Sequence, residues 1–131
     1  MTGPLNGLHV LILEDEFLIA MDVEQLCRDN GAEDVTILRT LKDFREPADG
    51  GPAFDVAIVD LMLGGESTVD FAKRLRERGT PFIFASGYTD FNELRASFPG
   101  VVLVGKPYGG EELIAAVTRA AAGVDLERFT D

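Results

Sequence analysis

The chain has 131 residues, 12 of them basic and 23 acidic, so its formal net charge is −11 at neutral pH. A chain of this length folds as one domain, and a hydrophobic content of 46% is enough for its core. The acidity disfavours binding to nucleic acid or anionic lipid, and no apolar run is long enough for a membrane span or a signal peptide.

Five short apolar runs along the chain are predicted to be strands. They are nearly continuous in β-branched, leucine and aromatic residues, which is typical of parallel strands covered by helices on both faces. The runs are residues 8–13, 35–38, 56–59, 82–85 and 101–104.

Amphipathic segments between the runs are predicted to be helices. One carries an apolar stripe of Ile19, Val23, Leu26 and Cys27 and would end at Asn30 and Gly31. Two more are predicted over 67–78 and after Gly110. Shorter helices are expected over 41–48 and 90–97, where prolines and glycines crowd the sequence.

The alternation of strand and helix predicts an α/β fold, a (βα)5 doubly wound parallel sheet. We expect a single domain over residues 1–131, with its core in 6–122 and a C-terminal tail in 123–131. Ligands of such sheets bind beyond the carboxyl ends of the strands, so functional residues should directly follow each strand.

Charged and polar side chains do follow the predicted strands: Glu14 and Asp15 the first, Asp60 the third, Ser86 the fourth and Lys106 the fifth. Any one of the acids could simply cap a helix. Three carboxylates in one small volume repel one another unless a cation intervenes, and oxygen ligands favour Mg²⁺ over zinc. The set therefore indicates a magnesium site.

These motifs resemble the receiver domain of two-component response regulators over about residues 6–122. The resemblance is carried by VLILEDE at 10–16, VAIVDLML at 56–63, FASG at 84–87 and GKP at 105–107. Four such motifs in order, each after its own predicted strand, are specific. The resemblance implies a flavodoxin-like fold with strand order 2-1-3-4-5.

The resemblance also implies the chemistry. Asp60 would accept a phosphoryl group from a histidine kinase, and Lys106 and Ser86 would contact the phosphoryl oxygens. Mg²⁺ would be held by Asp15, Asp60, the Met62 backbone carbonyl and, through water, Glu14. Such a protein is a phosphoacceptor that assists its own phosphorylation and dephosphorylation, not an enzyme acting on a separate substrate.

Partners follow from the same resemblance. PFIFASGY at 81–88 is similar to the PFxFATGY signature of receivers paired with HWE-class histidine kinases. The single cysteine, which can form no internal disulfide, favours a reducing, cytoplasmic setting. The chain would signal by docking to a downstream protein through the face of its fourth helix, fifth strand and fifth helix, or would drain phosphate from a kinase. Leu103 replaces the usual switch aromatic residue, and Tyr88 could gate access to the site. The Lys106-Pro107 bond resembles the family's cis peptide.

Two functions of other classes are alternatives that the residues fit less well. A haloacid dehalogenase-type phosphohydrolase needs a second aspartate two residues after the nucleophile, where this chain has Met62. A flavodoxin-like cofactor binder needs a phosphate loop after the first strand, where Glu14 and Asp15 would repel phosphate. The chain could also be the receiver portion of a longer regulator.

Four other features have plain structural interpretations. Cys27 and the pair Phe82 and Phe84 are expected in the core. His9 is expected to pack or to hydrogen-bond at the first strand, and the arginines of 67–78 to form a solvated helix face.

Overall fold

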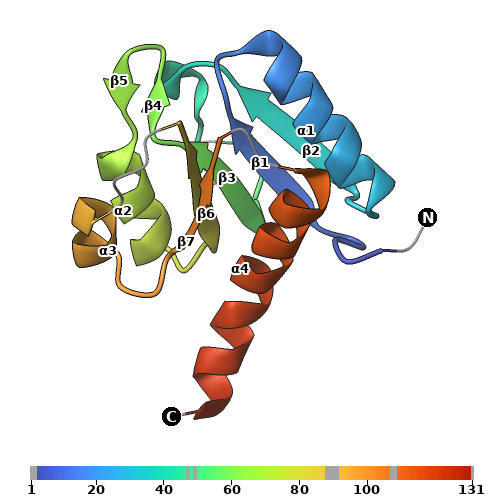
Figure 1. Ribbon diagram of the computed structural model, residues 1–131, viewed down its shortest axis with the longest axis vertical. Coiled ribbons are helices and arrows are strands. Elements are labelled where there is room, and N and C mark those ends of the chain that lie inside the picture. The colour runs from blue at the N-terminus through green and yellow to red at the C-terminus, as the bar shows by residue number, and fades with distance from the viewer. Residues whose placement is uncertain (1–2, 47, 49, 88–91, 107–108, 131) are drawn as a thin grey trace.

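A parallel sheet of five strands forms the centre of the molecule (Figure 1). The computed structural model describes residues 3–46, 48, 50–87, 92–106 and 109–130. The strand order is β2-β1-β3-β6-β7, the predicted 2-1-3-4-5 arrangement. The strands are β1 (His9–Leu13), β2 (Asp34–Leu38), β3 (Val56–Asp60), β6 (Phe82–Ser86) and β7 (Val102–Gly105).

Four helices cover the sheet, two on each face (Figure 1). Side chains alternate along each strand, so Val10 and Ile12 of β1 pack towards α1 and α4, while Leu11 and Leu13 pack towards α2 and α3. Both faces are apolar, which is why the strands read as continuous hydrophobic runs. The helices are α1 (Phe17–Asp29), α2 (Val69–Glu77), α3 (Asn92–Ser97) and α4 (Gly110–Thr130).

The predicted helices agree with the structure in most places. Helix α1 buries Val23 and Cys27 of its predicted stripe and ends at Asp29. Helix α3 is short, as expected, and the beginning of the 90–97 prediction lies outside the described residues. Helix α4 continues to Thr130, so the backbone of residues 123–130 is helical.

The second crossover lacks the helix predicted over 41–48. The described residues there contain 3-10 structure and no α-helix, and η1 (Leu41–Asp43) is a 3-10 helix. Prolines and glycines follow within a few residues and prevent a helix from propagating. Instead, the Phe44 ring packs edge-on against Phe71 of α2, with ring centroids 4.8 Å apart. Phe44 thereby covers part of the hydrophobic cluster that contains Phe71.

A small hairpin that the sequence analysis did not predict follows β3. Its strands are β4 (Met62–Leu63) and β5 (Glu66–Ser67). The turn consists of Gly64 and Gly65, with φ of 58° and 84°. Two consecutive residues of positive φ match the twist of a hairpin, and Gly-Gly is a known sequence signal for this turn.

The arginines at 74, 76 and 78, in α2 and at its C-cap, are exposed but not simply solvated. The guanidinium groups of Arg74, Arg76 and Arg78 lie over the rings of Phe71, Phe98 and Phe44, 4.9–5.7 Å from the ring centroids. Such cation–π contacts contribute about 0.5–1 kcal/mol each at exposed sites. The predicted solvated face is therefore wrong in part, because each arginine also covers an aromatic residue.

The expectations for Cys27, Phe84 and His9 are confirmed, whereas Phe82 is only partly buried. Cys27 and Phe84 are fully buried, and Phe82 packs edge-on against Phe84. His9 Nε2 lies 3.0 Å from Glu33 Oε2, at the amino end of β1. Among the helices of the described residues, none combines the length and apolarity of a membrane span.

Candidate functional site

Asp60 is the last residue of β3, at the carboxyl edge of the sheet. It pairs in register with Ala85 of β6, whereas the pairing of β3 with β1 ends one residue earlier, at Val59. The side chain is 13% exposed, so it lies in a recess open to solvent. The Met62 N–H points at Asp60 Oδ1 from 3.4 Å.

Glu14 and Asp15 directly follow β1, the strand beside β3. Glu14 is buried, and its Oε2 accepts a hydrogen bond of 3.2 Å from the Glu16 N–H. Asp15 is half-buried, and its Oδ2 accepts a 3.2 Å hydrogen bond from the Gly64 N–H. The β4–β5 hairpin therefore leans over the site and touches one of its acids.

Lys106 reaches the same place from the end of β7. Its Nζ donates to Glu14 Oε1 at 2.6 Å and to Asp60 Oδ2 at 2.9 Å. Its main-chain N–H donates to the carbonyl of Ser86 at 2.7 Å. Ser86 is buried at the end of β6, next to the residue that pairs with Asp60. One lysine thus joins acids from two strands.

Burial and pairing set the charges of the site. Burial raises the pKa of Glu14 above its ordinary value, and the hydrogen bonds from Lys106 and the Glu16 N–H oppose it only partly. Burial acts to lower the pKa of Lys106, but the hydrogen bonds with Glu14 and Asp60 outweigh it, so the net pKa is raised. The ammonium group is therefore charged at neutral pH.

The acidic side chains suit a hard divalent cation. Glu14, Asp15 and Asp60 each offer one carboxylate oxygen, and these oxygens lie within 4.8 Å of one another. An octahedral Mg²⁺ with bonds of about 2.1 Å holds its ligand oxygens roughly 3–4 Å apart. The spread fits two direct carboxylate ligands with a third joined through water, so the donor set and its spacing fit the ion.

The structure brings together the acids and the lysine that the sequence predicted at this edge. Ser86 lies on the strand beside Asp60, and Met62 lies two residues beyond it, at the start of the hairpin. Tyr88 and Pro107 are outside the described residues. The cluster carries three carboxylates against one ammonium, a formal charge of −3 + 1 = −2.

Two groups at the site were not found from the sequence. The Gly64 N–H contacts Asp15, and the Thr68 hydroxyl contacts the backbone of Asp60. The Gly-Gly pair could have indicated the hairpin. Thr68 precedes an amphipathic run, a position that indicates a helix cap, so the sequence signal pointed to a different use of its hydroxyl.

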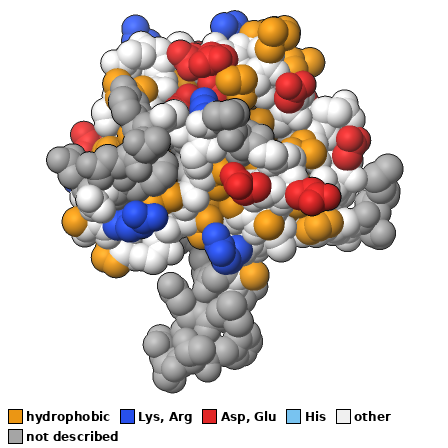
Figure 2. Space-filling view, in the orientation of Figure 1, with side chains coloured by type: hydrophobic (Ala, Val, Ile, Leu, Met, Phe, Trp, Pro, Cys, Tyr) orange, Lys and Arg blue, Asp and Glu red, His pale blue; other side chains and the backbone are white. Residues whose placement is uncertain are grey.

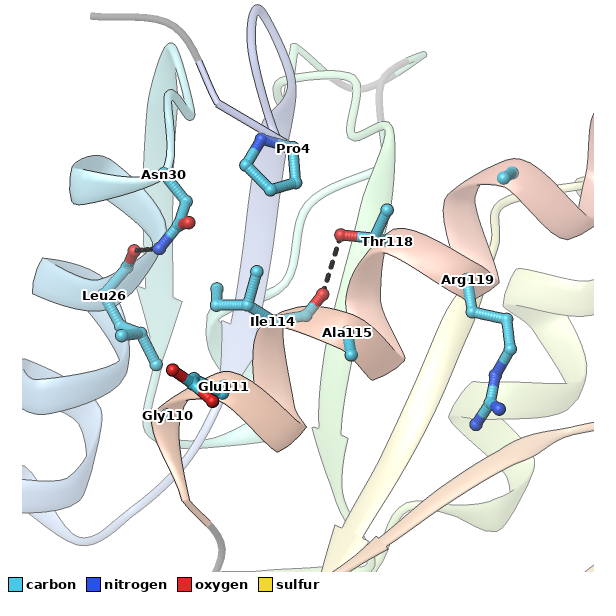
Figure 3. A pocket seen from close by; sticks show the side chains of 10 residues that line it. Pro4, Leu26, Asn30, Gly110, Glu111, Ile114, Ala115, Thr118 and Arg119 are labelled. Atoms are coloured by element: carbon cyan, nitrogen blue, oxygen red, sulfur yellow. Dashed lines mark hydrogen bonds between the residues drawn. The ribbon is translucent and has the colours of Figure 1, made fainter.

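A pocket of about 760 Å³ lies elsewhere, between α1 and α4 (Figure 3). Leu26 and Ile114 line it from the two helices, and Pro4 lines it from the N-terminal segment. None of the clustered acids nor Lys106 is among its lining residues. The acidic recess is therefore separate from this apolar groove.

An exposed apolar patch adjoins the recess. Phe17, Leu18 and Met21, at the start of α1, are 58%, 77% and 45% exposed. In Figure 2, acidic and hydrophobic side chains lie next to each other at the top of the molecule, where Figure 1 places the beginning of α1. The α1 patch, as we call these three residues, is a surface that another protein could cover.

Comparison with known proteins places these features in a family. The model of the response regulator receiver domain matches residues 10–118. None of the curated protein sequences matches the chain significantly.

Solved structures share the fold. A response regulator receiver protein from Sinorhizobium medicae is 23% identical, with a TM-score of 0.78 over 92% of this chain and 98% of that chain. The response regulator DrrB of Thermotoga maritima is 26% identical, with a TM-score of 0.72 over 93% and 54%. A mutant of the anti-anti-sigma factor PhyR from Bartonella quintana is 27% identical, with a TM-score of 0.72 over 92% and 50%. This chain spans about half of the last two proteins.

Proposed function

Since this chain belongs to the response regulator receiver domain family, we propose that it accepts a phosphoryl group from a histidine kinase onto Asp60. The observation that carries the proposal is the pair of hydrogen bonds from Lys106 Nζ to Asp60 and Glu14. They hold a cation at the end of β3, beside a half-buried carboxylate, where a phosphoryl group would add negative charge.

The proposed transfer is a single displacement. A carboxylate oxygen of Asp60 attacks the phosphorus of a phosphohistidine in the donor. A P–O bond forms and the P–N bond breaks, with its electron pair going to the imidazole nitrogen. The histidine leaves as neutral imidazole if its other ring nitrogen carries a proton, and Asp60 becomes an acyl phosphate.

The charges of the residues in the recess suggest which of them would hold Mg²⁺ and which would contact the phosphoryl group. Asp15, Asp60 and the Met62 carbonyl would hold Mg²⁺ directly, and Glu14 would hold it through water. The ion, when bound, would offset the negative charge of the carboxylates and of the incoming phosphoryl group. Lys106 would pair with a phosphoryl oxygen, and the Ser86 hydroxyl would donate a hydrogen bond to another.

We further propose that the α1 patch receives the donor protein. A phosphohistidine must approach Asp60 across the rim of the recess, and this patch begins two residues after Asp15. Its exposed side chains offer apolar area to a partner, while the acidic rim favours a donor with basic residues. PFIFASGY at 81–88 supports an HWE-class kinase as that donor, in the cytoplasm.

The proposal also covers what the phosphorylated chain does next. Phosphorylated chain would dock to a downstream protein through the face of α3, β7 and α4, or would serve as a phosphate sink for the kinase. The family match covers residues 10–118, and we propose that residues 1–131 act as one receiver domain. A role as the receiver portion of a longer regulator is compatible with the same chemistry.

Acetyl phosphate tests the acceptor without a partner protein. Incubated with Mg²⁺ and this donor, the chain should gain one phosphoryl group that is labile in alkali, as seen by intact mass. Asp60→Asn should gain none, whereas Asp70→Asn, an exposed aspartate on α2, should behave like the wild type. Labelling of Asp60→Asn to the wild-type extent would refute the assignment.

A further inference from the structure

Thr68 is fully buried, although the four residues before it are exposed. Its Oγ1 lies 2.6 Å from the carbonyl oxygen of Asp60 and 3.0 Å from that of Leu61. Its main-chain N–H also donates to the Leu61 carbonyl, at 3.0 Å. One residue therefore binds the backbone of Asp60 and Leu61, eight and seven residues earlier in the chain.

The Thr68 hydroxyl does not cap α2, although its position favours that role. Thr68 precedes the first residue of α2, where a threonine hydroxyl normally accepts a hydrogen bond from the first turn. It makes no such bond; instead Ser67 Oγ accepts from the Val69 N–H, at 3.2 Å. The Thr68 hydroxyl is directed back to the strand that carries Asp60.

The Asp60 carbonyl needs this donor because the sheet does not supply one. The Leu61 N–H donates to Ala85 of β6, so the planar peptide turns the Asp60 carbonyl to the opposite side, towards β1. There the pairing of β1 with β3 has already ended at Leu13 and Val59. The Thr68 hydroxyl occupies the place of the next ladder partner.

The same residue fixes the hairpin over the site. The bond from the Thr68 N–H to the Leu61 carbonyl closes the base of the β4–β5 hairpin, which holds Met62. The tip of the hairpin reaches Asp15 through the Gly64 N–H. The positions of the Asp60 carboxylate and of the Met62 backbone both depend on the anchored base.

We propose that Thr68 is a positioning residue for phosphoryl acceptance: its hydroxyl, held on the Asp60 and Leu61 carbonyls, fixes the Asp60 carboxylate against Lys106 and the Met62 carbonyl against the acids. The inference rests on the proposed function of Asp60. Small displacements of a reacting group slow a reaction strongly, because catalysis of phosphoryl transfer is mostly positioning.

The test separates the hydroxyl from the packing of the side chain. Thr68→Val keeps the shape and removes the donor, whereas Thr68→Ser keeps the donor and removes the methyl group. Thr118→Val is the matched control, because the Thr118 hydroxyl donates to the Ile114 carbonyl within α4, away from the site. The measurements are the acetyl phosphate rate constant at saturating Mg²⁺, the Mg²⁺ dissociation constant by calorimetry, and Tm.

We expect Thr68→Val to label about tenfold more slowly than the wild type and to bind Mg²⁺ more weakly. Thr68→Ser should stay within about twofold of the wild type in rate, even if its Tm falls as far as that of Thr68→Val. Thr118→Val should change neither rate nor Mg²⁺ affinity. If Thr68→Val does not fold, Thr68→Ala replaces it, with the same expected slow rate relative to Thr68→Ser.

Two results would overturn the inference while leaving the acceptor role intact. One is a Thr68→Val rate equal to that of the wild type; the other is a Thr68→Ser rate as low as that of Thr68→Val, since packing alone would then explain both. If wild-type protein takes up no phosphoryl group, or Asp60→Asn takes up as much, the acceptor assignment fails and the Thr68 role fails with it.

Discussion

The ammonium nitrogen of Lys106 lies 2.6 Å from Oε1 of Glu14, although 92 positions separate the two residues in the chain. They follow β7 and β1, which are not neighbours, since β3 and β6 lie between them in the sheet. The lysine therefore reaches across the end of β3 and bonds Asp60 on the way. This bridge is what concentrates opposite charges at one point of the sheet edge.

Removal of the bridge should destabilise the protein when metal is absent. In Lys106→Met, the buried Glu14 and the half-buried Asp60 lose their cation, at a cost of about 2–4 kcal/mol in the free energy of unfolding. Excess Mg²⁺ should recover part of the loss. Urea unfolding in EDTA and in Mg²⁺ measures both, with Lys73→Met, an exposed lysine of α2, as control. Equal stability of Lys106→Met and wild type in EDTA would contradict the prediction.

Magnesium should stabilise the folded chain, because the carboxylates come together only on folding. At a concentration ten times the dissociation constant, the gain is about 1.4 kcal/mol, or roughly 5 °C in Tm for a chain of this size. Asp15→Asn should lose most of this shift, whereas Asp22→Asn, on the exposed side of α1, should keep it. A thermal scan with and without Mg²⁺ measures the rise in Tm. If Asp15→Asn shows the same rise as the wild type, the cluster is not the magnesium site.

Ionisation of Glu14 should make stability depend on pH in metal-free buffer. Burial holds its pKa above the unfolded value of about 4.3, so between the two values the folded state binds more protons. The contribution of Glu14 to the free energy of unfolding therefore falls as pH rises through that window and stays low above it. The groups that face it are Lys106 and Asp60.

The comparison with Glu14→Gln isolates this contribution, because glutamine resembles the protonated acid. Urea unfolding in EDTA from pH 4 to 8 should give a free energy, wild type minus Glu14→Gln, that decreases with rising pH. A difference that is constant or increases with pH would mean that Lys106 outweighs burial at this carboxylate.

The α1 patch should matter for a protein donor and not for a small one. Leu18 is 77% exposed, so Leu18→Asp should leave folding and acetyl phosphate labelling unchanged. Transfer from a phosphorylated kinase should slow by at least about tenfold, since an acid would be buried against the donor. Ala115→Asp, on the exposed side of α4, is the matched control. Equal slowing in both variants, or none in Leu18→Asp, would refute the patch as the donor surface.

Cys27 should be inert in the folded chain. It is fully buried, and burial raises the pKa of its thiol to about 12. Iodoacetamide at pH 8 should therefore label it only as fast as the chain opens, with a rate that rises with urea. Above the unfolded pKa of about 8.5, stability should fall as pH rises, because only the unfolded chain releases this proton. Rapid native labelling would contradict the burial.

The strands and the site edge could be predicted from the sequence. Short continuous apolar runs that alternate with amphipathic segments are typical of parallel strands buried on both faces, and the carboxyl ends of parallel strands share one edge. That is why the residues after the runs, among them Asp60 and Lys106, could be placed together before any contact was known. Their roles are proposals that the phosphorylation experiments test.

The parts that could not be predicted depend on contacts between distant segments. A short helix is predicted over 41–48, yet the described residues there form no α-helix and Phe44 packs against Phe71 instead. The arginines over 74–78 look like a solvated charge run, yet three aromatic rings lie beneath them. Local pattern describes what a segment can bury, but not which partner the tertiary structure brings to it.

By itself, the sequence determined the class of fold and the edge of the sheet that carries the charges, because strand and helix periodicity report burial directly. Only the tertiary structure decided how those charges pair and what holds them. Lys106 bonds Glu14 across two intervening strands and bonds Asp60 at the end of one of them, and Thr68 turns its hydroxyl from the helix it precedes to the carbonyl of Asp60. Both sets of hydrogen bonds form where neighbouring strands end and leave donors and acceptors without a partner in the sheet. A local sequence pattern does not show which groups these are.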